Sequence, residues 1–122
     1  MYTMDKNCTV YKTMDFISKK WTLLILLELY KGNKEKKRYS EIKNKMEDIT
    51  PKVLSARLKE LEKEGLIKRI VDASRFPVKT EYFLTESGKD FVPIVSQMKN
   101  WALRWKPHQE ICESVDCETC NL

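Results

Sequence analysis

One segment of the chain marks both of its own ends and constrains the fold more than any other. Thr50 offers a side-chain oxygen that can cap a helix, and Pro51 supplies the φ angle that suits the first helical residue. One narrow stripe of the segment is apolar, at Leu54, Leu58 and Leu61. Gly65 follows as a stop signal. The pattern predicts a helix over residues 50–64 with one buried and one exposed face.

The residues before this segment predict three more helices. An amphipathic helix is expected over residues 9–18, and an almost wholly apolar one over residues 21–30, which Gly32 ends. After a lysine-rich loop, Ser40 can cap a short helix over residues 40–46. The apolar helix is expected to form the centre of the core.

The residues after Gly65 predict a hairpin and a last helix. Two β-rich runs, residues 66–71 and 79–84, flank a turn that contains Pro77. The last helix opens at Thr85 and has one apolar face, formed by Phe91, Val95, Met98, Ala102 and Trp105. This order is mainly α with a small β-hairpin, which is the arrangement of a winged helix-turn-helix with terminal dimerisation helices.

The outward face of the helix over residues 50–64 is suited to a DNA major groove. With the leucines turned inward, Lys52, Ser55, Ala56, Lys59 and Lys63 point outward, and Arg57 lies on the flank. The candidate DNA-contacting residues are Ser40, Thr50, Lys52, Ser55, Ala56, Arg57 and Lys59, with Arg75 and Lys79 in the wing. The alternative is that lysines interleaved with Glu60, Glu62 and Glu64 form only a solvated charged surface.

The loop before the short helix leaves two interpretations open. Lys34, Lys36, Lys37 and Arg38 could contact DNA phosphates, or they could form a loop whose charges only keep it soluble.

Charge divides the 122-residue chain into two parts. The net charge is +5, and residues 107–122 hold four acidic residues and no Lys or Arg. Residues 1–106 therefore carry +9, which favours a polyanionic partner such as double-stranded DNA. We expect one winged helix-turn-helix DNA-binding and dimerisation domain over residues 8–106 and an acidic, cysteine-rich tail over residues 107–122.

The N-terminus shows no signal peptide, and no apolar run is long enough to span a bilayer. A cytoplasmic protein without a membrane partner is therefore expected, with its four cysteines largely reduced.

Several large apolar side chains are too many for one small winged domain to bury. The first and last helices carry Tyr11, Met14, Met98, Trp101 and Trp105. These residues predict a homodimer in which the two terminal helices pair across a two-fold axis.

Several motifs between Cys8 and Trp105 together resemble the HxlR-type family of bacterial and archaeal transcriptional regulators, winged-helix proteins related to the MarR type. The motifs are Cys8-Thr-Val, Lys20-Trp-Thr-Leu-Leu-Ile-Leu, Arg38-Tyr-Ser-Glu-Ile, Ile49-Thr-Pro-Lys-Val-Leu-Ser-Ala-Arg-Leu-Lys-Glu-Leu-Glu, Gly65-Leu-Ile and Glu81-Tyr-Phe-Leu-Thr-Glu-Ser-Gly. The resemblance implies dimeric DNA binding with the helix after Thr50 as the reader. It also implies that Cys8 occupies the place of a cysteine that senses oxidants or electrophiles in several members.

An enzyme is not expected. The chain has one histidine, His108, and no phosphate-binding glycine loop, so neither a His-based triad nor a nucleotide site can be assembled in the domain. The competing function is a winged-helix protein-interaction module that does not bind specific DNA.

The tail offers a possible metal site. His108, Cys112, Cys117 and Cys120 follow the spacing H-x3-C-x4-C-x2-C, and such ligands suit tetrahedral zinc. The three cysteines also match the start of a plant-type iron–sulfur spacing, which lacks its fourth cysteine unless Cys8 supplies it. The alternative, which we favour over a metal site, is an unfolded tail with free thiols or a local disulfide.

Overall fold

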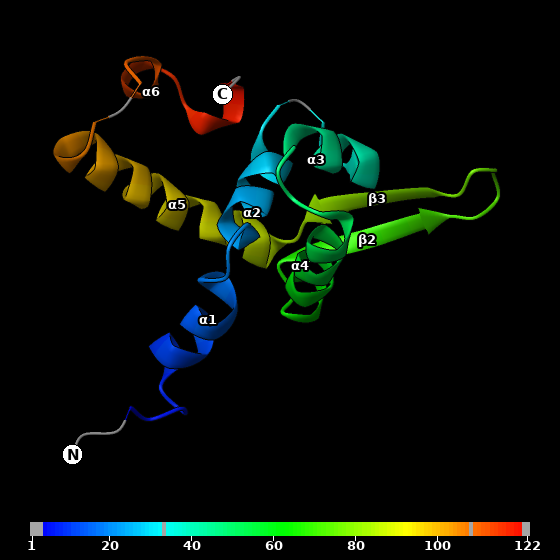
Figure 1. The fold of residues 1–122 in the computed structure, drawn as a ribbon, viewed down its shortest axis with the longest axis horizontal. Coiled ribbons are helices and arrows are strands. Elements are labelled where there is room, and N and C mark those ends of the chain that lie inside the picture. The colour runs from blue at the N-terminus through cyan, green and yellow to red at the C-terminus, as the bar shows by residue number, and fades with distance from the viewer. Residues whose placement is uncertain (1–3, 33, 108, 121–122) are drawn as a thin grey trace.

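The computed structural model describes residues 4–32, 34–107 and 109–120 and is built around helix α2 (Thr22–Tyr30) (Figure 1). The helix is apolar on most sides, so its neighbours cover it from several directions. Its contacts are with α1 (Thr9–Ile17), α3 (Tyr39–Lys45), α4 (Pro51–Lys63) and α5 (Glu86–Trp105). As predicted, α2 is the centre of the core.

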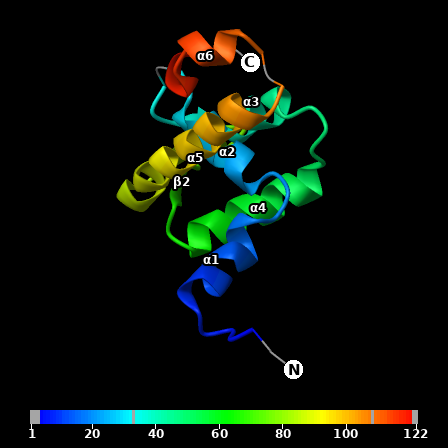
Figure 2. The same ribbon diagram turned by 90° about the vertical axis from the view of Figure 1, so that its left-hand side faces the viewer.

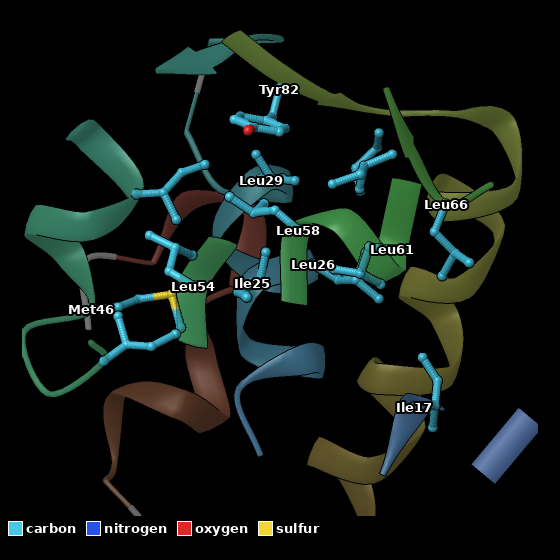
Figure 3. Close-up of a cluster of buried hydrophobic side chains, with 14 of the residues drawn as sticks. Ile17, Ile25, Leu26, Leu29, Met46, Leu54, Leu58, Leu61, Leu66 and Tyr82 are labelled. Atoms are coloured by element: carbon cyan, nitrogen blue, oxygen red, sulfur yellow. The ribbon is translucent and has the colours of Figure 1, made fainter. Parts of the chain in front are cut away.

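Helix α4 confirms the prediction made from its end signals. The Thr50 Oγ1 atom accepts a hydrogen bond from the Val53 N–H at 3.2 Å, and Gly65 has the left-handed φ of +86° that stops the helix. The leucine stripe is fully buried, at Leu54, Leu58 and Leu61. Figure 3 shows this stripe lying against Ile25 and Leu26 of α2. The opposite face of α4 is exposed.

Helix α3 begins one residue before the predicted start. The predicted cap, Ser40, is wrong, because Arg38 is the N-cap residue and Ser40 lies inside the helix on its exposed side. The Glu41 carboxylate accepts a hydrogen bond from the Arg38 N–H at 3.2 Å, which satisfies a backbone donor without a hydroxyl cap.

The sheet has three antiparallel strands where the sequence predicts two. The predicted hairpin is present as β2 (Ile67–Asp72) and β3 (Lys79–Leu84), and β1 (Lys37–Arg38) pairs with the other edge of β3. The Nζ atom of Lys37 is buried and bonds to the backbone carbonyl of Glu28, with the Glu28 carboxylate 3.4 Å away. Of the two interpretations of the lysine-rich loop, phosphate contact is therefore wrong for Lys37.

Helix α5 starts against the sheet and extends well beyond it. The Thr85 Oγ1 atom accepts from the Gly88 N–H at 3.2 Å and donates to the Gly65 carbonyl at 2.6 Å, which ties the start of α5 to the end of α4. Gly88 and Val92 are buried in the core. The C-terminal half of α5, together with α1, lies on the side away from the hairpin tip (Figure 1).

The tail folds back over α2 and α5 (Figure 2). It contains α6 (Ile111–Ser114) and a 3-10 turn, η1 (Cys117–Thr119). The Glu118 carbonyl accepts from the Gly32 N–H, and the Val115 carbonyl accepts from Lys99 Nζ, both at 2.8 Å. For the described residues 109–120, the unfolded-tail alternative is therefore wrong.

Tyr30 is a further anchor for the tail. Its hydroxyl donates to the Glu118 carboxylate at 3.4 Å. Burial, with the negative charges of Glu118 and Asp116 nearby, raises the pKa of Tyr30, so the hydroxyl keeps its proton for this bond.

Within the described ranges, no helix combines the length and the apolar character that crossing a bilayer requires.

Candidate nucleic-acid interface

A hollow of about 690 Å³ lies between the exposed face of α4, the start of α3 and the hairpin. Its lining consists of Arg38, Tyr39, Ser40, Ser55, Lys59, Arg69, Arg75, Pro77, Val78, Lys79, Thr80 and Tyr82. We call this hollow the basic groove, because five lining residues are Lys or Arg and none of the described lining residues is Asp or Glu. Figure 1 shows the hairpin projecting beyond α3 and α4, so strands form one side of this groove and helices form the other.

The predicted residues of α4 present the face that the sequence indicates. Lys52, Ser55, Ala56 and Lys59 are all exposed. Ser55 and Lys59 line the basic groove, whereas Lys52 and Ala56 lie on the exposed face beside it. Thr50 is exposed as well, although its hydroxyl oxygen is occupied as the helix cap.

Arg57 has a different environment from the other predicted contacts. It is half-buried, and its Nε atom donates to the Lys20 carbonyl at 3.0 Å. Trp21, which follows Lys20 in the chain, has a φ of +83°, which a bulky residue rarely adopts. Arg57 thus secures a strained junction between α1 and α2, and Lys19 supports the same contact with an ion pair to Glu60 at 2.6 Å.

Six lining residues were not predicted from the sequence as DNA contacts: Tyr39, Arg69, Pro77, Val78, Thr80 and Tyr82. Arg69 lies opposite Tyr82 in the β2–β3 register, and Tyr39 opens α3. Burial raises the pKa of Tyr82 against the opposing effect of the Arg69 charge, so its hydroxyl stays neutral in the groove wall. The strand register and the start of α3 were the signals needed to find these residues.

The two cations predicted as DNA contacts in the wing differ in their surroundings. Arg75 is exposed at the tip, while Lys79 lies 3.5 Å from the Glu81 carboxylate. The turn is ordered by Asp72, whose pKa is lowered by hydrogen bonds from the Ser74 hydroxyl and N–H. The Phe76 side chain is 99% exposed beside Arg75 and was also missed in the sequence.

The predicted dimer residues lie on the terminal helices. Met14 on α1 and Met98, Trp101 and Trp105 on α5 are exposed in the single chain, at 51%, 52%, 56% and 66%, and Tyr11 is half-buried. A monomer of this size rarely exposes so many large apolar side chains together.

Cys8 has an exposed thiol at the N-cap position of α1. Its carbonyl accepts from the Lys12 N–H at 3.0 Å, so the residue is fixed to the start of the helix while its side chain remains accessible.

The cysteines of the tail do not converge as a zinc site requires. Cys112, Cys117 and Cys120 are half-buried and form no disulfide with another described cysteine. Within residues 4–32, 34–107 and 109–120, no group of three or more His, Cys, Asp or Glu side chains could hold a metal. The fourth predicted ligand, His108, lies outside the described residues.

Three comparisons with known proteins agree with this geometry. The HTH-type transcriptional regulator YvaP of Bacillus subtilis (strain 168), itself uncharacterized, is 43% identical over 94 residues, which cover 77% of this chain and 83% of YvaP. A transcriptional regulator of the MarR family from Porphyromonas gingivalis W83 has a similar structure, with a TM-score of 0.73 and 32% identity over 86% of this chain and 99% of that one. The redox regulator HypR in its oxidized form matches with a TM-score of 0.70 and 37% identity, over 83% of this chain and 100% of HypR.

The fold is that of the winged-helix, MarR-like regulators, with α3 and α4 as the helix-turn-helix and β2 and β3 as the wing. Residues 16–110 match the HxlR-like helix-turn-helix family. The chain therefore belongs to the HxlR-like helix-turn-helix family of transcriptional regulators.

Proposed function

We propose that the protein is a dimeric, sequence-specific DNA-binding transcriptional regulator. The observation that carries the proposal is the basic groove, in which five cationic side chains gather without a described acidic one beside the exposed face of α4. An α-helix fits the major groove of B-DNA, and cationic side chains on the flanking elements bind phosphates. The HTH-type regulators among the relatives support this function.

The proposed contacts divide into two classes. Lys52, Ser55, Ala56 and Lys59 face base edges from α4. Phosphate contacts come from Ser40, Thr50, Arg75 and Lys79, to which the groove adds Arg38 and Arg69. We assign no base contact to Arg57, because its guanidinium holds the Lys20 carbonyl.

The dimer is proposed on the apolar surface of α1 and α5 described above. Pairing these helices across a two-fold axis would cover Met14, Met98 and Trp101 and place two α4 helices on one duplex. The operator is then two-fold symmetric, with half-sites about 10 base pairs or a multiple apart.

DNA binding should weaken steeply with salt. If the dimer neutralises about 8 phosphates, the logarithm of affinity should fall against the logarithm of salt concentration with a slope of about −7. Fluorescence anisotropy with the duplex that lies upstream of the protein's own gene measures this slope. Absence of binding at low salt would instead support a protein-interaction module.

The two classes of contact should respond differently to substitution. Lys52→Ala or Lys59→Ala should change the preferred sequence, whereas Arg75→Ala or Lys79→Ala should weaken binding to all duplexes alike. Because Lys79 is paired with Glu81, its loss should cost less than the loss of Arg75. Affinities for the operator and for a scrambled duplex, measured side by side, separate the two effects. If the ratio of operator affinity to scrambled-duplex affinity were the same in all four variants, the assigned roles would be contradicted.

We also propose that Cys8 makes DNA binding thiol-responsive. The exposed thiol at the start of a proposed dimerisation helix and the similarity to the redox regulator HypR support this role. In a background that carries Cys112→Ser, Cys117→Ser and Cys120→Ser, a disulfide-forming oxidant should change operator affinity by about tenfold. Adding Cys8→Ser should abolish the response, and an equal response with and without Cys8 would eliminate the role.

A further inference from the structure

The hydroxyl of Tyr39 lies at the first turn of α4. Its oxygen is 3.3 Å from the Pro51 carbonyl oxygen and 3.4 Å from the Ser55 Oγ atom. The ring is half-buried against the core, so the position of the hydroxyl is set by packing. Both Tyr39 and Ser55 line the basic groove, which places this contact at the surface that the proposed function assigns to DNA.

The two contacts fix which atom donates each hydrogen. A carbonyl oxygen only accepts, so the bond to Pro51 uses the single hydrogen of the Tyr39 hydroxyl. The bond between Tyr39 and Ser55 then requires Ser55 Oγ to donate its own hydrogen. With that hydrogen used within the protein, Ser55 Oγ keeps its two lone pairs and can act toward the groove only as an acceptor.

The neighbouring side chains make this acceptor distinctive. Lys52 and Lys59 offer only donors, and Ala56 offers only a methyl group. In the major groove, donors on the protein suit guanine and thymine oxygens, whereas an acceptor suits the exocyclic amino groups of adenine N6 and cytosine N4. Ser55 is thus the member of this four-residue face that can select an amino group.

We propose that Tyr39 is a positioning residue that holds the Ser55 hydroxyl as an acceptor, so that Ser55 reads the amino group of one adenine or cytosine in each half-site. This inference rests on the proposed function, because it needs α4 in the major groove. To the proposed function it adds which base group is recognised at one position of each half-site. It also adds Tyr39, a residue that acts on DNA only through Ser55.

Selection from a random duplex pool, followed by affinity measurements, tests the proposal. The wild type should enrich a motif, and Ser55→Ala should lose the preference for adenine or cytosine at one position of each half-site. Tyr39→Phe keeps the ring and should weaken the same preference, by about 5-fold, which corresponds to one hydrogen bond. The double variant should lose no more of this preference than Ser55→Ala does, because the two substitutions remove the same interaction.

A base analogue identifies the atom that is read. Purine in place of adenine, or 2-pyrimidinone in place of cytosine, removes the amino group at that position. The wild type should lose about 5-fold in affinity on the analogue, and Ser55→Ala should lose nothing. Tyr30→Phe is the matched control, because it removes a phenol oxygen that bonds to Glu118 of the tail and does not line the basic groove, and its preference at this position should remain.

The outcomes separate the inference from the proposed function. A wild type that enriches no motif would overturn both. A wild-type motif that is unchanged in Ser55→Ala or Tyr39→Phe would overturn the inference and leave the DNA-binding function standing. A uniform loss of affinity in Tyr39→Phe, with its base preference intact, would show a purely structural tyrosine and would also overturn the inference.

Discussion

A Trp101→Asp variant is expected to sediment as a folded monomer at concentrations where the wild type is a dimer. Trp101 is 56% exposed on the part of α5 that extends beyond the sheet, so the single chain does not need its side chain for the core. In the proposed dimer, two aspartates would instead be buried within an apolar interface, which is strongly unfavourable. The monomer can then hold only one half-site, and operator affinity should fall by about 100-fold or more.

Analytical ultracentrifugation gives the mass, and circular dichroism confirms that the fold is retained. Ile111→Asp is the matched control, because Ile111 is an apolar side chain exposed on α6, outside the proposed surface. It should remain dimeric and keep its operator affinity. If Trp101→Asp stays a dimer, the two-fold contact lies elsewhere on the molecule.

The parts of the fold with local end signals could be predicted from the sequence. Thr50, Pro51 and Gly65 act through their own backbone and the adjacent turn, and α4 begins and ends where they indicate. The apolar run of α2 can be identified as a core helix from the sequence alone, because apolar residues occupy nearly every side of it.

The elements that depend on distant partners were less predictable. Strand β1 has two residues, which is too short for an alternating pattern, and it exists because Lys37 and Arg38 pair with Tyr82 and Glu81 on β3. The start of α3 was shifted for a similar reason, since the side chain of Glu41, rather than the expected Ser40, satisfies the first backbone donor.

The candidate site shows the same division. The 3.6-residue period correctly places Lys52, Ser55, Ala56 and Lys59 on the exposed face of α4. It gives no information on Arg69, which reaches the groove through strand register, or on Arg57, whose bond to Lys20 joins α4 to the turn between α1 and α2. Helical periodicity therefore predicts a face, whereas the groove requires the relative placement of α4 and the wing.

Replacing Gly88 by alanine is expected to destabilise the domain strongly, although helix propensity predicts the opposite. Gly88 lies in the first turn of α5, where alanine alone would stabilise by about 1 kcal/mol. A Cβ atom at this position would lie 2.1 Å from the Leu66 carbonyl oxygen and 3.1 Å from Leu84 Cδ2. The Leu66 oxygen belongs to the backbone and also accepts from the Thr85 N–H at 3.0 Å, so no side-chain rotation relieves the overlap.

Relief of this overlap requires α5 to move away from the start of β2, which breaks the Thr85 bonds and loosens the packing of Val92. We expect a net loss of about 3 kcal/mol in the free energy of unfolding, and a melting temperature lower by about 10 °C. Urea unfolding and thermal melting followed by circular dichroism measure both. Ser87→Ala is the matched control, because Ser87 precedes Gly88 and its side chain is exposed, so only helix propensity acts there. This substitution should raise the free energy of unfolding by about 0.5 kcal/mol. A Gly88→Ala protein as stable as the wild type would show that α5 has room for a Cβ atom beside the Leu66 carbonyl. The close approach of α5 to Leu66 would then not explain the glycine at this position.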